Sequence, residues 1–566
     1  MYVRSTPRKN RDGSVVRYLQ LAHNVWDPAA KRSRVQVVYN FGREDEANRA
    51  ALQRLVASVT RFLDPDQALA ASADGLEFIE SRPLGGTWTL DGLWRRLRID
   101  KTMMQLLAGR RLDERAERVL FALVANRALA PSSKLAAARW VNEDVLIDGL
   151  AQTTDDACYR AMDWLIEIKD ALEQEVFHQV ANLLNLEVDL LFFDTTSTYF
   201  EVDQADTPVA RNERGIPLPD SADDGGYPVR GFRSYGKSKD HRDDLPQVVI
   251  GMAVTRTGIP VRVWCWPGAT NDSALIRQVK DDMRDWTLSR IVWVADRGFA
   301  SEANRRWLRQ GDHHYIIGEK LRSGSDEATA ALSRQGRYQD VAANLRVKEV
   351  RIAEGERFVI CFNPDAAERD AAIRTRLVAH LQELIDGSDR LSVTKRAELR
   401  GVISTKPGLN RYLRVTPGGL LRVNAAAIKT ETNLDGKYLL RTSDPKLSAE
   451  DIALGYKQLL EVERGWRDMK QVIDLRPVYH RKEQRIRAHV VLCWLALLLV
   501  RLVETTSGDT WPTLRRELDR IAVGTFAGPV GVFRQRTEIT KPQRDILAKL
   551  HLDPPPRILQ LTPADA

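Results

Sequence analysis

The chain has 566 residues, of which 43% are hydrophobic and 29% are charged, and 85 Lys and Arg against 77 Asp and Glu give a formal net charge of +8. This composition excludes an intrinsically disordered chain, and the length exceeds what one hydrophobic core supports, so two to four structural units are expected. The modest positive charge permits a polyanionic partner without requiring one. Four cysteines without a CxxC pair, and no secretory signal, predict a cytoplasmic protein.

The N-terminal third divides into a β-rich region and a helical region. The segments "SVVRYLQLAHNVW" and "RVQVVYNFG" follow the turn signal "NRDG" and predict a small sheet within residues 1–62. Apolar residues then recur every three or four positions, so residues 63–185 are expected to be helical. Helices dotted with arginine are typical of a DNA-binding domain, but a plain helical domain with solvated basic faces explains them about as well.

Strands and helices alternate through residues 186–320. The strand-like segments "VDLLFFD", "PQVVIGMAVT" and "IPVRVWCW" follow one another closely, whereas "RIVWVAD" and "HHYIIGEK" come after helices expected near 273–286 and 302–310. Three closely joined strands, followed by strands separated by helices, indicate a mixed sheet with helices packed on it.

The alternation is lost over residues 321–445, where a hairpin, a charged helix near 365–386 and several short β segments indicate an inserted subdomain. In residues 446–510, one helix is expected over 448–473, after the capping sequence "SAED", and another over 484–504. The apolar run "VVLCWLALLLV" in the second helix is about half the length that spans a bilayer, so a buried helix is predicted. Residues 511–566 are expected to be helical with a loosely ordered tail.

Two of the predicted strands end in an aspartate. Asp194 follows the apolar run in "VDLLFFDTTSTYFE", and Asp296 follows "RIVWVA". A single aspartate at such a position often caps the next turn. Two of them in one sheet favour a functional site, because like charges a few Å apart ionise together only with a cation between them. Oxygen ligands without His or Cys suit Mg²⁺ or Mn²⁺.

The segment "YKQLLEVERGWRDMK" offers a third carboxylate. On a continuous helix, Tyr456, Glu463 and Lys470 share nearly one face, and Arg467 lies on the same side. Taken alone, this pattern is better explained as a solvated, salt-bridged helix face. Glu461 is the competing ligand, and it lies roughly 160° around the helix from Glu463, so only one of the two can point toward the aspartates.

Together these segments resemble the DDE transposases of bacterial insertion sequences, in the group with the signature Y-x2-R-x3-E-x6-K. Tyr456, Glu463 and Lys470 are in register with the signature, whose Arg position is Leu459 here. The segments "YGKSKDHRDDLPQ", "GIPVRVWCWPGATNDS" and "DLRPVYHRKEQRIRAHV" agree with it. The resemblance covers roughly residues 190–505. It implies a mixed α/β fold whose ribonuclease-H-like catalytic core is interrupted by a β-rich insertion, beside the N-terminal β region and the helical domain.

The resemblance also implies a function. The protein would cleave DNA at the ends of its element and transfer the strands into target DNA by phosphoryl transfer. Asp194, Asp296 and Glu463 would hold two Mg²⁺ ions, with Mn²⁺ as a substitute, and Asp194 would bridge the two ions. The partners would be double-stranded DNA, as terminal inverted repeats and as target, and a second copy in a homodimer on DNA, with no membrane.

Seven side chains are expected to contact the DNA backbone, namely Tyr456, Lys470, Arg467, Arg297, Lys237, Lys239 and Arg242. For the last three, a solvated loop is an equally good explanation. Two other functions remain open. One is a metal-dependent nuclease of the same fold that cuts without joining, and the other is a sequence-specific DNA-binding protein that has lost catalysis. The intact set of carboxylates argues against the latter.

Overall fold

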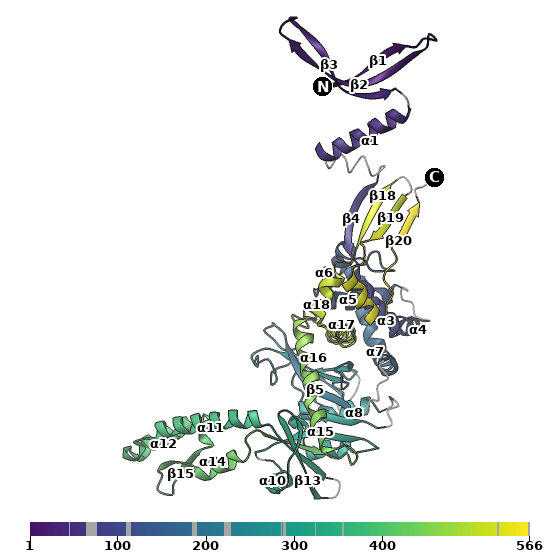
Figure 1. Cartoon of the computed structure of the whole chain (residues 1–566). Coiled ribbons are helices and arrows are strands. Elements are labelled where there is room, and N and C mark those ends of the chain that lie inside the picture. The colour runs from purple at the N-terminus through teal and green to yellow at the C-terminus, as the bar shows by residue number, and fades with distance from the viewer. Residues whose placement is uncertain are drawn as a thin grey trace. The chain divides into compact units, whose positions relative to one another are not determined.

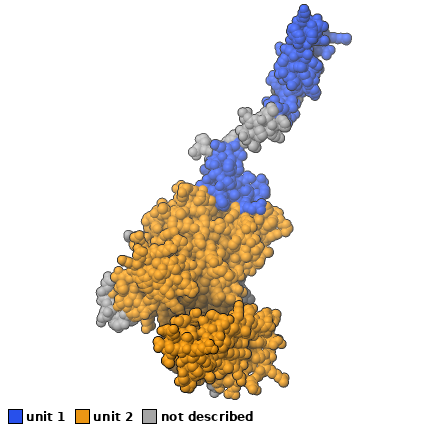
Figure 2. Space-filling view, turned by 90° about the vertical axis from the view of Figure 1, so that its left-hand side faces the viewer, with its two compact units in different colours: residues 1–83, 520–539, 554–566 blue, residues 84–519, 540–553 orange. Residues whose placement is uncertain are grey.

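The computed structural model describes residues 1–44, 46–63, 76–108, 115–183, 190–219, 228–284, 286, 290–322, 324–353, 356–528 and 531–563. They form two compact units, which Figure 2 shows in blue and orange. The first unit comprises residues 1–83, 520–539 and 554–566, and the second comprises residues 84–519 and 540–553. Each unit mixes helices and strands.

The first unit contains two antiparallel sheets. One is formed by β1 (Tyr2–Lys9), β2 (Val15–Asp27) and β3 (Arg32–Arg43), and α1 (Glu46–Leu63) follows it. The predicted N-terminal sheet is therefore confirmed, although the expected boundary at residue 62 falls inside α1. Among the described side chains of residues 1–63, Ala22 is the only buried one, so this sheet has almost no core of its own.

The second sheet pairs β4 with three strands from the C-terminal end of the chain (Figure 1). Its strands, in spatial order, are β20 (Ile558–Pro563), β19 (Gly531–Arg536), β18 (Ala522–Gly528) and β4 (Glu77–Pro83). The expectation of a helical region with a loosely ordered tail is thus wrong for these residues. Phe526 stacks on Phe533 and meets Phe78 edge to face, and these cross-strand ring contacts stabilise the sheet.

The second unit begins with the predicted helices. They are α3 (Gly85–Arg96), α4 (Ile99–Leu107), α5 (Ala116–Leu129), α6 (Lys134–Arg139), η1 (Trp140–Asp144) and α7 (Asp155–Leu183). Both α5 and α7 pack on α17 (Glu483–Ser507). Among the described helices, α17 alone has the length and composition to cross a membrane, and 94% of its apolar window is buried inside the protein. The predicted buried helix is confirmed. The unit also contains α18 (Trp511–Leu518) and α19 (Lys541–Lys549).

A nine-stranded mixed sheet forms the centre of the second unit. Its strands, in spatial order, are β12 (Gln339–Ala342), β13 (Leu345–Ala353), β14 (Glu356–Phe362), β17 (Lys437–Thr442), β11 (His314–Glu319), β10 (Val292–Ala295), β5 (Leu190–Tyr199), β8 (Gln247–Val254) and β9 (Pro260–Pro267). The strands β5, β10 and β11 run parallel, and β8 and β9 are antiparallel to their neighbours. The core on one face includes side chains of α8 (Asp272–Asp282) and α9 (Glu302–Leu308).

The insertion is less rich in strands than expected. Its strands β12, β13, β14 and β17 extend the central sheet. The insertion also contains α10 (Asp326–Ser333). The part from 364 to 432 is mainly helical, with α11 (Pro364–Ile385), η3 (Ser388–Arg390), α12 (Val393–Ser404), α13 (Pro407–Asn410), α14 (Ala425–Thr432) and a small hairpin of β15 (Leu413–Val415) and β16 (Leu421–Val423). Strong helix formers fill α11, and Asn363 and Ser392 cap α11 and α12.

The helix expected over 448–473 is divided in two. It consists of α15 (Ala449–Lys457), which begins with the predicted Ser448 capping box, and α16 (Leu460–Gln471). Between them the backbone tightens, because the N–H of Leu459 bonds to the carbonyl of Tyr456 at 3.0 Å and the N–H of Glu461 to that of Gln458 at 2.9 Å. Tyr456 and Glu463 therefore belong to different helices.

Candidate active site

Asp194 and Asp296 lie level with each other on neighbouring parallel strands. Val292 pairs with Leu190 and Val294 with Phe192, and the same register continued brings Asp296 opposite Asp194. Alternate side chains of these strands, including Phe193, enter the core beside α8 and α9. The two aspartates therefore face the other side of the sheet, where α15 and α16 contact it.

The expectation that the first strand ends at Asp194 is wrong. β5 continues to Tyr199, and Asp194 lies within it, opposite Met252 of β8. The β-branched threonines that follow Asp194 continue the strand. Two hydroxyls of this stretch have structural partners, since Thr195 Oγ1 donates to Asp272 at 3.0 Å and Ser197 Oγ accepts from the N–H of Lys239 at 2.8 Å. Asp194 thus has no turn to cap.

The carboxylates of Asp194, Asp296 and Glu463 interact electrostatically at this position. Burial chiefly, with smaller contributions from the negative charges of Asp296 and Glu463, raises the pKa of Asp194 to about 7, and the charge of Lys239 opposes the shift. The three acids predicted from the sequence, contributed by β5, the end of β10 and α16, are therefore near one another.

Asp296 has a second contact. Its Oδ1 accepts a hydrogen bond from the N–H of Gly298 at 2.7 Å and caps the short helix η2 (Arg297–Phe299). The turn-capping role considered for both aspartates thus exists at Asp296, where it involves one of the two carboxylate oxygens.

The two glutamates of α16 point to different partners. Glu461 binds Nη2 of Arg501 at 2.6 Å, and this arginine is 1% exposed inside α17. Glu463 is exposed, and its negative charge contributes to raising the pKa of Asp194. Gly465 allows close packing here, because a Cβ at this position would lie 2.7 Å from Cε of Met252 in β8. Glu461 therefore connects α16 to α17, which leaves Glu463 for the aspartates.

Tyr456 lies beside Asp296. Burial and, to a smaller extent, the charge of Asp296 raise the pKa of its hydroxyl to about 12, while Arg297 opposes the shift. The ring stacks on Tyr438 with centroids 6.1 Å apart. Gly318 of β11 permits this position, since a Cβ there would lie 2.5 Å from the Tyr456 hydroxyl oxygen.

A hollow of about 620 Å³ opens next to Tyr456 and Asp296. Its cationic lining consists of Arg297, Lys320, Arg322 and Lys437. Of these, the sequence reasoning predicted only Arg297. Lys320 and Arg322 follow β11 and Lys437 begins β17, none of them within a motif, and pairing across the sheet brings them together. Arg322 already pairs with Glu431 at 2.7 Å.

The other residues predicted to contact DNA differ in the partners that they have within the protein. The positive charge of Lys239 acts to lower the pKa of Asp194, and its Nζ lies 3.5 Å from a carboxylate oxygen of Asp272. Lys470 Nζ donates to Asp240 at 3.0 Å. Arg242 forms two bonds of 2.9 Å to Asp244. Lys237 and Arg467 have exposed side chains.

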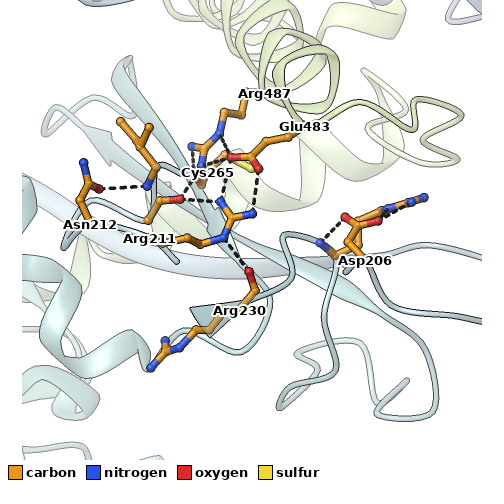
Figure 3. Close-up of polar contacts among 10 residues, drawn as sticks. Asp206, Arg211, Asn212, Arg230, Cys265, Glu483 and Arg487 are labelled. Carbon is orange, nitrogen blue, oxygen red and sulfur yellow. Dashed lines mark hydrogen bonds and ion pairs between the residues drawn. The ribbon is translucent and has the colours of Figure 1, made fainter. Parts of the chain in front are cut away.

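The buried Arg211 anchors the excursion, the segment between β5 and β8 that includes Lys237 and Lys239 (Figure 3). Arg211 donates to both carboxylate oxygens of Glu483, at 3.1 and 2.9 Å, and to the carbonyls of Gly215 and Arg230, each at 2.8 Å. Arg487 shares Glu483 and also donates to the carbonyl of Cys265. These bonds attach the excursion to the first turn of α17.

The donor set of the candidate site consists of carboxylate oxygens. Among the described residues, no three His, Cys, Asp or Glu side chains are grouped closely enough to hold a metal ion. As they stand, the three acids are thus neighbours without forming a closed ligand shell.

Comparison with known proteins identifies the family. Residues 215–499 match the family model of the transposase DDE domain, and residues 3–70 match that of the IS1634 family transposase N-terminal domain. Asp296 and Glu463 lie in the first range, and Asp194 lies upstream of it. No curated protein is significantly similar. A solved piggyBac transposase synaptic complex with hairpin DNA aligns over 76% of each chain at 12% identity, with a TM-score of 0.32, which is too low to establish a shared fold. Because the first match spans half of the chain, the protein belongs to the DDE transposases of insertion sequences.

Proposed function

We propose that this transposase cleaves and joins DNA at Asp194, Asp296 and Glu463. The observation that carries the proposal is the level placement of the two aspartates on parallel strands, with the charge of Glu463 added to theirs. We further infer that β9, β8, β5, β10 and β11 form the ribonuclease-H-like core. Three antiparallel neighbours followed by two parallel strands, with the aspartates on the central strand and beside it, support this inference.

The donor chemistry fits Mg²⁺, with Mn²⁺ as a substitute. Three carboxylates without His or Cys are hard oxygen ligands, and the raised pKa of Asp194 reflects chiefly its burial and, to a smaller extent, the charges of the two other acids. Two divalent ions held here would supply activation of the attacking hydroxyl and stabilisation of the leaving oxygen. Asp194, on the central strand, is the acid best placed to be shared between them.

Other side chains of the site would position the DNA backbone. Tyr456, whose pKa is raised to about 12, is protonated at neutral pH, and its hydroxyl can donate to a phosphate oxygen. Arg297, Lys320 and Lys437 line the hollow next to it. We infer that one DNA strand passes Asp296 along this cationic lining.

The duplex outside the cleavage site would bind the N-terminal sheet. Residues 1–62 contain 12 Lys and Arg against 5 Asp and Glu, a net charge of +7, whereas residues 63–185 contain 14 against 20, a net charge of −6. Phosphate contacts depend on positive charge, so this distribution favours β1–β3 over the helical region, for which DNA binding was expected. Joining two element ends also calls for a second copy of the chain on the DNA.

Cleavage and joining assays test the catalytic assignment. The substrate is a supercoiled plasmid carrying the gene with its flanking DNA, incubated with the full chain and Mg²⁺. Asp194→Ala and Glu463→Gln should abolish cleavage while duplex binding persists, and the exposed Glu450→Gln in α15 is the matched control. Undiminished cleavage by Asp194→Ala would refute the assignment. With pre-cleaved ends and a target plasmid, cutting without joined product would favour the nuclease alternative.

The N-terminal assignment has a separate test. Arg32→Gln with Arg34→Gln removes two exposed cations from β3. If both contact phosphates, the slope of log affinity against log salt becomes shallower by about 1.8, at about 0.9 per contact. An unchanged slope would place the duplex elsewhere.

A further inference from the structure

Asp240 lies between two cations from the part of the chain that follows Glu463. Its Oδ1 is 3.0 Å from Nζ of Lys470, and its Oδ2 is 3.1 Å from Nη1 of Arg476. The Arg476 guanidinium also lies over the ring of Tyr199, 4.8 Å from its centroid. The Asp240, Lys470 and Arg476 side chains are 18%, 15% and 26% exposed, so an anion from solvent can reach them.

This ion-paired group adjoins the three carboxylates. The N–H of Lys239, next to Asp240, bonds to Ser197 on the strand of Asp194, and the Lys239 charge acts on Asp194 itself. Lys470 follows Glu463 by two turns on the same face of α16. The two cations are therefore presented between the strand of one proposed catalytic acid and the helix of another.

We propose that Lys470 and Arg476 form a binding site for a DNA phosphodiester beside the catalytic carboxylates, and that the carboxylate of Asp240 occupies this site until DNA displaces it. The inference rests on the proposed function and adds Arg476 and Asp240 to it. A carboxylate and a phosphodiester both offer two anionic oxygens to Lys and Arg donors, so one can replace the other. An incoming phosphodiester keeps both cations paired, so the exchange leaves neither of these largely buried positive charges without a partner.

The alternative is a permanent structural ion pair, and binding at several salt concentrations distinguishes the two. The probe is a fluorescent 40-base-pair duplex of arbitrary sequence, titrated with the full chain in EDTA. Lys470→Gln and Arg476→Gln should each weaken binding and reduce the salt slope by about 0.9. Asp240→Asn should tighten binding about two- to thirtyfold, which corresponds to the loss of its two ion pairs, with Lys470 and Arg476.

Two further comparisons isolate the competition. In a chain that already carries Lys470→Gln and Arg476→Gln, adding Asp240→Asn should leave the affinity unchanged, because no cations remain to be released. Lys470→Arg and Arg476→Lys should preserve the wild-type slope, and Glu450→Gln, a change of the same charge, should preserve wild-type affinity. Melting temperatures of all variants identify any that fail to fold.

The proposal is overturned if Lys470→Gln and Arg476→Gln fold but keep the wild-type salt slope, or if Asp240→Asn folds and binds the duplex no more tightly than wild type. Either result would mean a permanent pair. Failure of the catalytic assignment would look different, because Asp194→Ala would then still cleave plasmid while the salt slopes remained as predicted here.

Discussion

Glu461 and Glu463, two residues apart on α16, should give opposite results when each is changed to Gln. Glu461→Gln removes the 2.6 Å contact to Arg501, a guanidinium that is 1% exposed. Breaking a fully buried ion pair costs about 3–5 kcal/mol. Glu461 is itself 31% exposed, and Arg501 keeps Glu504 at 3.1 Å and Asp468 at 3.7 Å, so the loss of unfolding free energy should be about 1–2 kcal/mol. Cleavage per folded molecule should persist.

Glu463→Gln should do the reverse. The side chain is exposed, so the unfolding free energy should change by less than about 0.5 kcal/mol. The variant loses one of the three proposed catalytic acids, and the cleavage rate should fall by about 10²-fold or more. Its loss should also lower the pKa of Asp194, because the charge of Glu463 contributes to raising that pKa.

The assay pairs thermal denaturation in EDTA with plasmid cleavage in Mg²⁺, both on the full chain. Rates are divided by the folded fraction, so that a less stable variant is not mistaken for an inactive one. Glu450→Gln controls for the loss of an exposed carboxylate in α15. Normal cleavage by Glu463→Gln, together with stable but inactive Glu461→Gln, would refute the assignment of the two glutamates.

Three further predictions concern single groups. In EDTA, Asp194→Asn should stabilise the fold by up to about 4 kcal/mol above pH 7 and little below pH 4. The reason is that the folded-state pKa near 7 exceeds the ordinary value of 3.8, so ionising Asp194 costs folding free energy as pH rises. Equal effects at pH 4 and 8 would contradict this. Burial lowers the pKa of His480 to about 4, so stability should fall by up to about 3 kcal/mol as pH drops from 6.5 to 4, and His480→Gln should flatten that dependence in denaturation curves. Gly318→Ala should displace the Tyr456 hydroxyl and slow cleavage about tenfold without weakening duplex binding; an unaffected rate would show that this position is not needed.

The two strands that carry the aspartates were predictable because strands buried on both faces appear as apolar runs. "LLFF" and "VWVA" gave that signal, and β5 and β10 are adjacent. The end of the first strand was not predictable, because Thr and Ser are also common in turns. Only the pairing of Thr195–Tyr199 with β8 determines that the strand continues, and this depends on residues some fifty positions later.

The choice between Glu461 and Glu463 shows a second limit. Helical periodicity separates their directions but does not say which direction faces the sheet. The partner of Glu461, Arg501, lies in another helix, directly after the apolar run "VVLCWLALLLV", and the periodicity of α16 does not point to it. Lys320 and Lys437 were missed for a similar reason, because hydrogen bonding between β11 and β17 brings them together across the insertion.

The charge distribution was available from the sequence but was obscured by averaging. The total of +8 is modest, yet residues 1–62 carry +7, residues 63–185 carry −6 and residues 186–566 carry +7. A polyanion interacts with local rather than total charge, since screening limits these interactions to about 10 Å. The arginines of the helical region suggested DNA binding, but its acids outnumber them, as in the Glu117 and Asp91 pairs with Arg118. Counting both signs, region by region, separates a basic surface from one that is merely rich in arginine.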